Sequence, residues 1–219
     1  MGGDISKQFM LWNEKPILLY TIQKFIDSPV DFKKIIVVIP PDSKEYCQEV
    51  LFDSEEIISK KVTLEEGGKE RQDSVYKGLL QMDQEIEIVC IHDGVRPFVT
   101  PDLISAAVKE ADYNGAVIPV LPLKDTLIEI NKDGTLIQTV DREKYKLVQT
   151  PQCFRKNIIM KAYEQAFREN FYATDDAALV RNMGKTVKTI TGELMNIKLT
   201  TPEDLLWAKL IHNQRNEGE

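Results

Sequence analysis

The sequence predicts an α/β protein with a mostly parallel, doubly wound sheet, that is, one covered by helices on both faces. Short apolar runs rich in valine and isoleucine alternate with helical patterns along the chain, which is typical of such sheets. One segment, at about residues 122–150, breaks the alternation and has the pattern of a β-hairpin. The chain has 219 residues, and we expect them to form a single domain over residues 1–219.

Each expected element follows from a local signal. An apolar helical repeat that starts at Pro16 predicts a helix to Phe25, because proline suits a first helical turn. Asp42 or Ser43 is placed to cap a second helix, which runs to about Phe52. β-branched apolar runs predict strands at residues 33–40, 62–64, 86–92, 116–120, 186–190 and 196–199.

The segment that breaks the alternation is predicted to form an arm. Residues 126–130 and 135–140 are its two strands, joined by a turn at residues 131–134, and residues 141–149 complete it. A two-stranded arm is marginally stable alone, so we expect it to pack against a second subunit. The alternative is that the arm folds back on its own core.

Helix starts are marked near the C-terminus. Thr174 and Asp175 precede a helix that ends at Gly184, and Thr201 followed by Pro202 begins the last helix. Acidic side chains at such starts are favoured by the helix dipole. We therefore interpret four acids as first-turn residues without another role: Asp175, Asp176, Glu203 and Asp204.

Composition and charge exclude several classes of function. No stretch is apolar enough for a membrane span, and the net charge of −7 provides no basic field for a nucleic acid. Three scattered cysteines without a C-x-x-C pattern, and no signal peptide before them, favour a soluble protein in a reduced cytoplasm. Only two histidines occur, His92 and His212, which excludes zinc clusters and most Ser-His and Cys-His schemes. We expect His92 to pack under a turn.

A candidate site follows the strand predicted at residues 86–92. The apolar run ends on Asp93, which is followed by Gly94 and Arg96. Ligands of open α/β sheets bind at the carboxyl ends of strands, so an acid and a base delivered there together predict a metal and phosphate site. An Asp-Gly turn with two solvated charges is the alternative.

Two further segments predict ligand contacts. Gly67 and Gly68 let a ligand approach the backbone, and the following helix start, with Arg71 and Ser74, favours phosphate or polar base edges. The pattern is neither a Walker loop nor a dinucleotide fingerprint. Lys198 lies in a short apolar run immediately before the last helix, where it either extends its ammonium group to solvent or contacts a phosphate.

Seven motifs occur in the order and spacing of one enzyme family. They are Gly-Gly-x-x-Arg-x-x-Ser-Val, His-Asp-x-x-Arg-Pro, Asp-Thr, Val-Asp-Arg, Thr-Pro-Gln-x-Phe, Thr-Asp-Asp-Ala and Asn-Ile-Lys-x-Thr-x-Pro-Glu-Asp-Leu. Between Ser6 and about Leu210 the chain resembles the 2-C-methyl-D-erythritol 4-phosphate cytidylyltransferases of isoprenoid biosynthesis. The resemblance implies a Rossmann-like nucleotidyltransferase domain and a homodimer in which the arm clasps the partner.

The resemblance also implies a reaction and its site. Such an enzyme joins CTP to 2-C-methyl-D-erythritol 4-phosphate and releases pyrophosphate, with Mg²⁺ held near Asp93. Lys7 matches a lysine that stabilises charge on the α-phosphate, and the other residues with an implied catalytic role are Arg142 and Lys198. The nucleotide is expected at Gly67, Gly68, Lys69, Arg71 and Ser74. The sugar phosphate is expected at Asp93, Arg96, Thr126, Arg142, Thr150 and Lys198, with Thr126 and Arg142 reaching across the dimer.

Two other functions stay open at this stage. The ribitol 5-phosphate cytidylyltransferases are the first, although Val140-Asp141-Arg142 and the Gly94 after Asp93 are more similar to the isoprenoid enzymes. Family members open with a strand and a glycine-rich loop, and Met1 aligns just after that loop, so we expect these parts to be missing upstream. A non-catalytic dimeric scaffold is therefore the second alternative.

Overall fold

The computed structural model describes residues 9–12, 15–52 and 61–216. In chain order its elements are β1 (Leu11–Trp12), β2 (Lys15–Pro16), α1 (Ile17–Ile26), β3 (Ile35–Ile39), α2 (Lys44–Phe52), β4 (Val62–Glu66), α4 (Arg71–Leu80), β5 (Ile88–Ile91), α5 (Pro101–Asn114), β6 (Ala116–Pro122), β7 (Leu127–Ile130), β8 (Leu136–Val140), the 3-10 helix η2 (Arg142–Lys144), β9 (Lys146–Val148), β10 (Gln152–Arg155), α6 (Lys156–Arg168), α7 (Asp176–Asn182), β11 (Lys188–Thr191) and α8 (Pro202–Asn216). This alternation of strands and helices confirms the α/β class.

The prediction of a strand at residues 196–199 is wrong. These residues form a loop between β11 and α8 instead. The amide of Leu199 donates to the Val95 carbonyl oxygen at 2.9 Å, and Asn196 closes a turn onto Glu193. Asn196 and Leu199 are buried, so the apolar character of this run reflects side-chain burial and not strand pairing.

The largest sheet is mixed, which corrects the expectation of a mostly parallel one. Its order is β11-β6-β10-β5, and β9 also pairs with β6. β11 runs parallel to β6, whereas β10 is antiparallel to both of its neighbours. β10 follows the arm without a crossover helix, so the chain re-enters the sheet in the opposite direction.

The expected single sheet is divided into two. β3 and β4 form a separate parallel pair, and among the described residues no strand joins β3 to β5. A cavity of about 660 Å³ lies there, lined by both strands and by apolar side chains of α1, α4 and α5 that include Ile22, Phe25, Val75, Leu79 and Val108. In the described chain, the edges of β3 and β5 that face each other have no strand paired to them. The described strands therefore do not form one continuous sheet.

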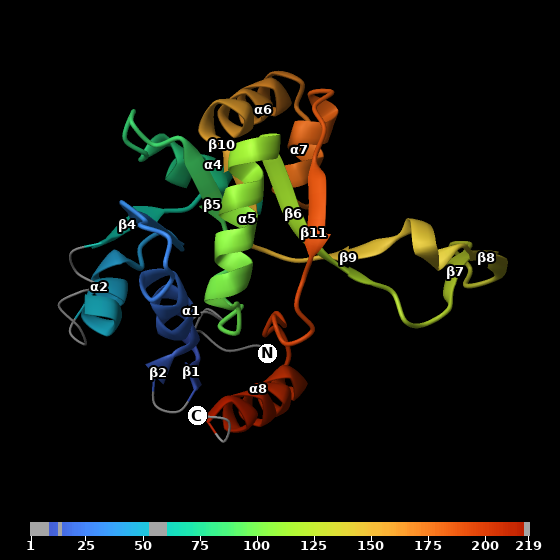
Figure 1. Ribbon diagram of the computed structural model, residues 1–219, viewed down its shortest axis with the longest axis horizontal. Helices are drawn as coiled ribbons and strands as arrows, with labels where there is room; N and C mark the ends of the chain where they lie inside the picture. The colour runs from blue at the N-terminus through green and yellow to red at the C-terminus, as the bar shows by residue number, and fades with distance from the viewer. Residues whose placement is uncertain (1–8, 13–14, 53–60, 217–219) are drawn as a thin grey trace.

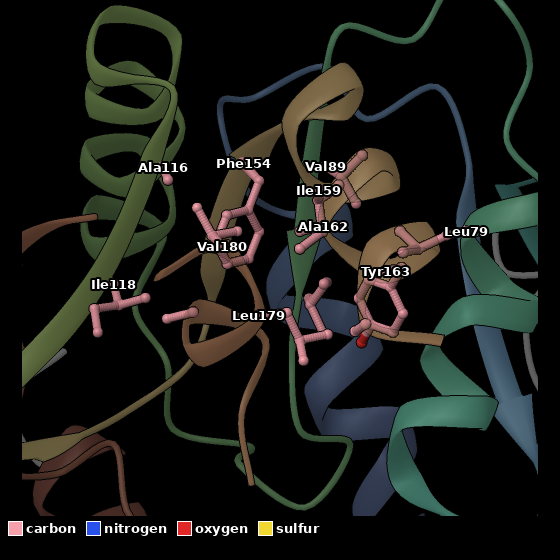
Figure 2. Packing of buried hydrophobic residues seen from close by; sticks show 13 residues of the cluster. Leu79, Val89, Ala116, Ile118, Phe154, Ile159, Ala162, Tyr163, Leu179 and Val180 are labelled. Atoms are coloured by element: carbon pink, nitrogen blue, oxygen red, sulfur yellow. The ribbon is translucent and has the colours of Figure 1, made fainter. Parts of the chain in front are cut away.

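Helices cover the mixed sheet on both faces, as predicted. Ala116 and Ile118 of β6 pack with residues of α6 and α7 in the cluster that Figure 2 shows. Val117, which points to the opposite face of the strand, packs with Ala107 and Ala111 of α5. Within the described residues, none of these helices has the length and apolar character needed to cross a membrane.

The arm projects from the body, as predicted. β7 and β8 form an antiparallel hairpin whose turn contains Gly134 at a φ of 85°, a conformation that favours glycine. Figure 1 shows the hairpin extending away from the helices, connected through β6 and β9. Four of its apolar side chains are about half exposed, from 48% at Ile128 and Ile137 to 57% at Leu136. The alternative in which the arm folds back on its own core is therefore wrong.

Candidate active site

The site is centred on Asp93, directly after β5. Oδ2 of Asp93 accepts a hydrogen bond from Nε of Arg96 at 3.1 Å and lies 3.2 Å from Nζ of Lys198. Burial raises the pKa of the Asp93 carboxyl, but the charges of Lys198 and then Arg96 outweigh it and hold the pKa below its ordinary value. The side chains of Asp93 and Arg96 are only 13% and 11% exposed, so the alternative of a turn with solvated charges is wrong.

The loop between β11 and α8 brings Lys198 to this carboxylate. Nδ2 of the fully buried Asn196 donates to the Thr150 carbonyl oxygen at 2.8 Å. The carbonyl oxygen of Asn196 accepts from Nη1 of Arg96 at 2.8 Å. These bonds fix the loop just before Lys198, so the ammonium group meets Asp93 instead of extending only into solvent.

His92 packs under the Asp93 turn, as predicted, and determines how Thr150 bonds. Burial lowers the pKa of His92 to about 4, so the ring is neutral and carries one proton at neutral pH. Nε2 lies 3.2 Å from the Arg96 carbonyl oxygen, which only accepts, so the proton is on Nε2. The Thr150 hydroxyl therefore donates to Nδ1 at 2.9 Å and accepts from the Asp93 amide at 3.1 Å. The Thr150 hydroxyl is therefore fixed between the His92 ring and the Asp93 amide.

The buried ring of His92 predicts a pH dependence of stability. Its pKa is about 4 in the folded state against 6.5 for an ordinary histidine, so the unfolded state binds the proton first as pH falls. The stabilisation is complete above pH 6.5 and is lost as pH decreases toward 4, at a cost of about 3 kcal/mol. We expect the free energy of unfolding of the wild type, relative to His92→Gln, to decrease by this amount in urea titrations across that range. A pH-independent difference would contradict the neutral ring.

Gly67 and Gly68 form the turn between β4 and α4, as predicted. The Gly68 amide donates to Oγ of Ser74 at 3.0 Å, and this hydroxyl donates to the Glu70 carbonyl oxygen at 3.0 Å. A β-carbon at Gly67 would lie 2.7 Å from Oγ of Ser74, and one at Gly68 would lie 2.3 Å from Cβ of Asp73. The turn therefore requires glycine at both positions, because its backbone packs closely against the start of α4.

Arg71 begins α4 and pairs with an acid from another helix. Its Nη1 and Nη2 contact Oδ1 and Oδ2 of Asp176 at 3.1 and 2.7 Å. The interpretation of Asp176 as only a first-turn acid is therefore wrong. Asp175 does cap α7, since its side chain accepts from the Ala178 amide.

The structure brings most of the predicted residues to one region. Arg71, Ser74 and Asp93 line the same cavity, and the charge of Arg71 contributes to lowering the pKa of the Asp93 carboxyl. Arg96 and Lys198 contact Asp93 directly, and Thr150 accepts from its amide. The residues predicted to bind a phosphate and those predicted to bind a nucleotide thus lie close together beside the end of β5.

Other predicted residues lie elsewhere. Thr126 and Arg142 are on the exposed arm, which Figure 1 shows directed away from the body. Nη1 of Arg142 donates to the carbonyl oxygen of Lys124, at the base of the same arm. Lys69 is exposed in the glycine turn, and Lys7 lies outside the described residues.

Comparison with known proteins identifies the family of the chain. A family model described as 2-C-methyl-D-erythritol 4-phosphate cytidylyltransferase matches residues 1–214. A protein of that name from Clostridioides difficile (strain 630) is 41% identical over 219 residues, which are 100% of this chain and 91% of the relative. The crystal structure of a protein of that name from Thermus thermophilus has a TM-score of 0.79 at 31% identity and covers 94% of both chains. The crystal structure of 4-diphosphocytidyl-2C-methyl-D-erythritol synthase from Anaerococcus prevotii has a TM-score of 0.81 at 30% identity, over 91% of this chain and 87% of the other. By its motifs, its fold and these matches, the chain belongs to the 2-C-methyl-D-erythritol 4-phosphate cytidylyltransferase family.

Proposed function

We propose that the protein transfers the cytidylyl group of CTP to 2-C-methyl-D-erythritol 4-phosphate, giving 4-diphosphocytidyl-2-C-methyl-D-erythritol and pyrophosphate. A phosphate oxygen of the sugar attacks the α-phosphorus of CTP, and the bond from that phosphorus to the β-phosphate oxygen breaks. The observation that carries the proposal is the ionised Asp93 held between Arg96 and Lys198 at the carboxyl end of β5. Fixed charges of both signs at this position suit a reaction between phosphate groups.

Arg96 and Lys198 are assigned to the phosphate of the sugar. Both cations are positioned before a ligand arrives, Arg96 by Asp93 and the Asn196 carbonyl and Lys198 by Asp93. Preorganised charges stabilise developing negative charge without further rearrangement. Lys198, with 42% of its side chain exposed, is accessible to an entering phosphate. Thr150 is assigned to a substrate hydroxyl, because its own hydrogen is donated to His92.

Asp93 fits a Mg²⁺ site that substrate phosphates complete. Mg²⁺ is usually held by one or two carboxylates with waters and phosphates, not by an all-protein cage. Arg96 and Lys198 both contact Oδ2 of Asp93, and the same carboxylate is the group that would hold the metal. When bound, the ion neutralises negative charge on the phosphates.

The glycine turn is assigned to the nucleotide. The turn at Gly67 and Gly68 leads directly into α4, and a helix start favours the negative charge of phosphate groups. Lys69, Arg71 and Ser74 complete this side of the site. Lys7 is assigned to the α-phosphate, where an ammonium group would stabilise the charge that develops during attack.

The arm is assigned to a homodimer interface that completes the partner's site. Its half-exposed Ile128, Ile130 and Leu136 form an apolar surface that a second subunit would cover. Thr126 and Arg142 lie on the same arm and are assigned to the sugar phosphate in the partner's site. This arrangement explains why both residues lie on a segment that projects away from its own body (Figure 1).

A comparison of two sugar phosphates tests the proposed function. CTP consumption and pyrophosphate release are measured with 2-C-methyl-D-erythritol 4-phosphate and with ribitol 5-phosphate at equal concentrations. We expect kcat/KM to be at least about tenfold higher with the methylerythritol substrate, since each misplaced hydroxyl leaves buried polar groups unpaired. A preference for ribitol 5-phosphate would establish the rival cytidylyltransferase. Binding of either sugar phosphate without CTP consumption would establish the non-catalytic scaffold.

A further inference from the structure

A buried ion pair joins α4 to α7 beside the glycine turn. Asp176 is 1% exposed, and its two oxygens contact the guanidinium of Arg71 in the bidentate geometry given above. Such geometry fixes the plane of the guanidinium as well as its position. Oδ1 of Asp176 also accepts a hydrogen bond at 2.5 Å from the hydroxyl of Tyr163, which is fully buried in α6. The carboxylate is therefore held in place before any ligand binds.

The pair lies at the border of the candidate site. Arg71 is three residues after Gly68 in the sequence, and its side chain lines the cavity together with Ser74 and Asp93. Burial lowers the pKa of Arg71, but the hydrogen bonds and the charge of Asp176 outweigh it and hold the pKa above its ordinary value. The guanidinium is thus a permanent positive charge on the nucleotide side.

Asp93 is the competing carboxylate for this charge. It lines the same cavity as Arg71, and its charge also acts on the guanidinium. Asp93 already contacts Arg96 and Lys198, and a third cation there would compete with these two for the carboxylate. A released Arg71 would also leave the glycine turn, where it supplies positive charge to the nucleotide.

We infer that Asp176 is a positioning residue, which holds the Arg71 guanidinium beside the glycine turn for CTP and keeps it away from Asp93. The inference rests on the function proposed above. Tyr163 supports this role, because its hydroxyl donates to Oδ1 of the same carboxylate and so helps to fix its orientation.

Contacts of Gln72 show that α4 and the segment before α7 are held together by bonds other than the Asp176 ion pair. Nε2 of Gln72 donates to the Phe171 carbonyl oxygen at 3.0 Å, and its Oε1 accepts from the Ala173 amide at 3.0 Å. These bonds attach the segment before α7 to α4 without using Asp176. Removal of the Asp176 charge is therefore expected to release Arg71 while α7 stays in place.

A double-mutant cycle followed by CTP titration calorimetry tests the inference. Asp176→Asn keeps the shape of the side chain and an acceptor for Tyr163 but removes the charge, and we expect the Kd for CTP to rise at least about tenfold. In an Arg71→Ala background the same substitution should change the Kd less than about twofold, because its effect passes through Arg71. Asp112→Asn is the matched control. It breaks an exposed pair with Arg155 at 3.1 Å and should leave CTP binding unchanged.

A second variant, Arg71→Lys, tests whether the effect of Asp176 is purely structural. Arg71→Lys leaves Asp176 in place and keeps the positive charge, but a lysine cannot form the two parallel hydrogen bonds of the guanidinium. It should therefore also weaken CTP binding several-fold. Equal loss of CTP affinity from Asp176→Asn in both backgrounds would overturn the inference, as would wild-type affinity in Arg71→Lys. If the wild-type chain bound no CTP, the proposed function itself would fail, whereas unchanged affinity in Asp176→Asn would remove the inference alone.

Discussion

Asp93→Asn is expected to lower kcat at least about a thousandfold, because it removes the charge that both neighbouring cations and the proposed Mg²⁺ require. Asparagine keeps the shape of the side chain, and the backbone amide at this position retains its bond to Thr150. Arg96 keeps its contact with the Asn196 carbonyl, and Lys198 is partly exposed. We therefore expect the unfolding temperature to change by only a few degrees. Pyrophosphate release and scanning calorimetry measure the two effects.

The matched control for this substitution is Asp102→Asn. Asp102 is an exposed acid in the first turn of α5, and its neutralisation should leave turnover unchanged. A large loss of stability in Asp93→Asn with turnover retained would show that Asp93 serves only the turn.

Arg142→Lys is expected to raise the KM for the sugar phosphate at least about tenfold while the KM for CTP stays unchanged. A planar guanidinium contacts a phosphate with two parallel hydrogen bonds, which an ammonium group does not reproduce. Because Arg142 is exposed on the arm, the substitution should have little effect on folding. Steady-state kinetics with each substrate varied in turn measure the effect.

Arg168→Lys provides the comparison for Arg142→Lys. Arg168 is an exposed arginine at the end of α6, outside the assigned site, and its replacement should give wild-type kinetics. Wild-type kinetics for Arg142→Lys as well would contradict the assignment of Arg142 to the sugar phosphate.

The sequence predicted the elements that local signals determine. The helix after Pro16, the strand at β3 and the hairpin arm each depend on periodicity or turn residues within a few positions. The strand β10 carried no such signal, because its place between β5 and β6 depends on pairing with distant strands. The apolar run at Asn196–Leu199 had a strand-like composition for another reason, since its side chains are buried in a loop.

The site was predictable where a strand end delivers its residues directly. Asp93 and Arg96 follow β5, and Lys198 stood out as a charge within an apolar run. The pairing of Arg71 with Asp176 was not predictable, because the two residues are 105 positions apart and a helix start explains an acid equally well. The bond from Thr150 to His92 spans 58 positions and likewise requires the folded chain.

In the proposed dimer, each active site combines Asp93 of one protomer with Arg142 of the partner subunit. The direct measurement is the turnover of an equal mixture of Asp93→Asn and Arg142→Ala chains, unfolded together and refolded so that dimers form at random. Half of these dimers are mixed, and each mixed dimer has one site with both native residues, so we predict about a quarter of the wild-type turnover. Turnover no higher than the average of the two variants measured separately would contradict the shared site.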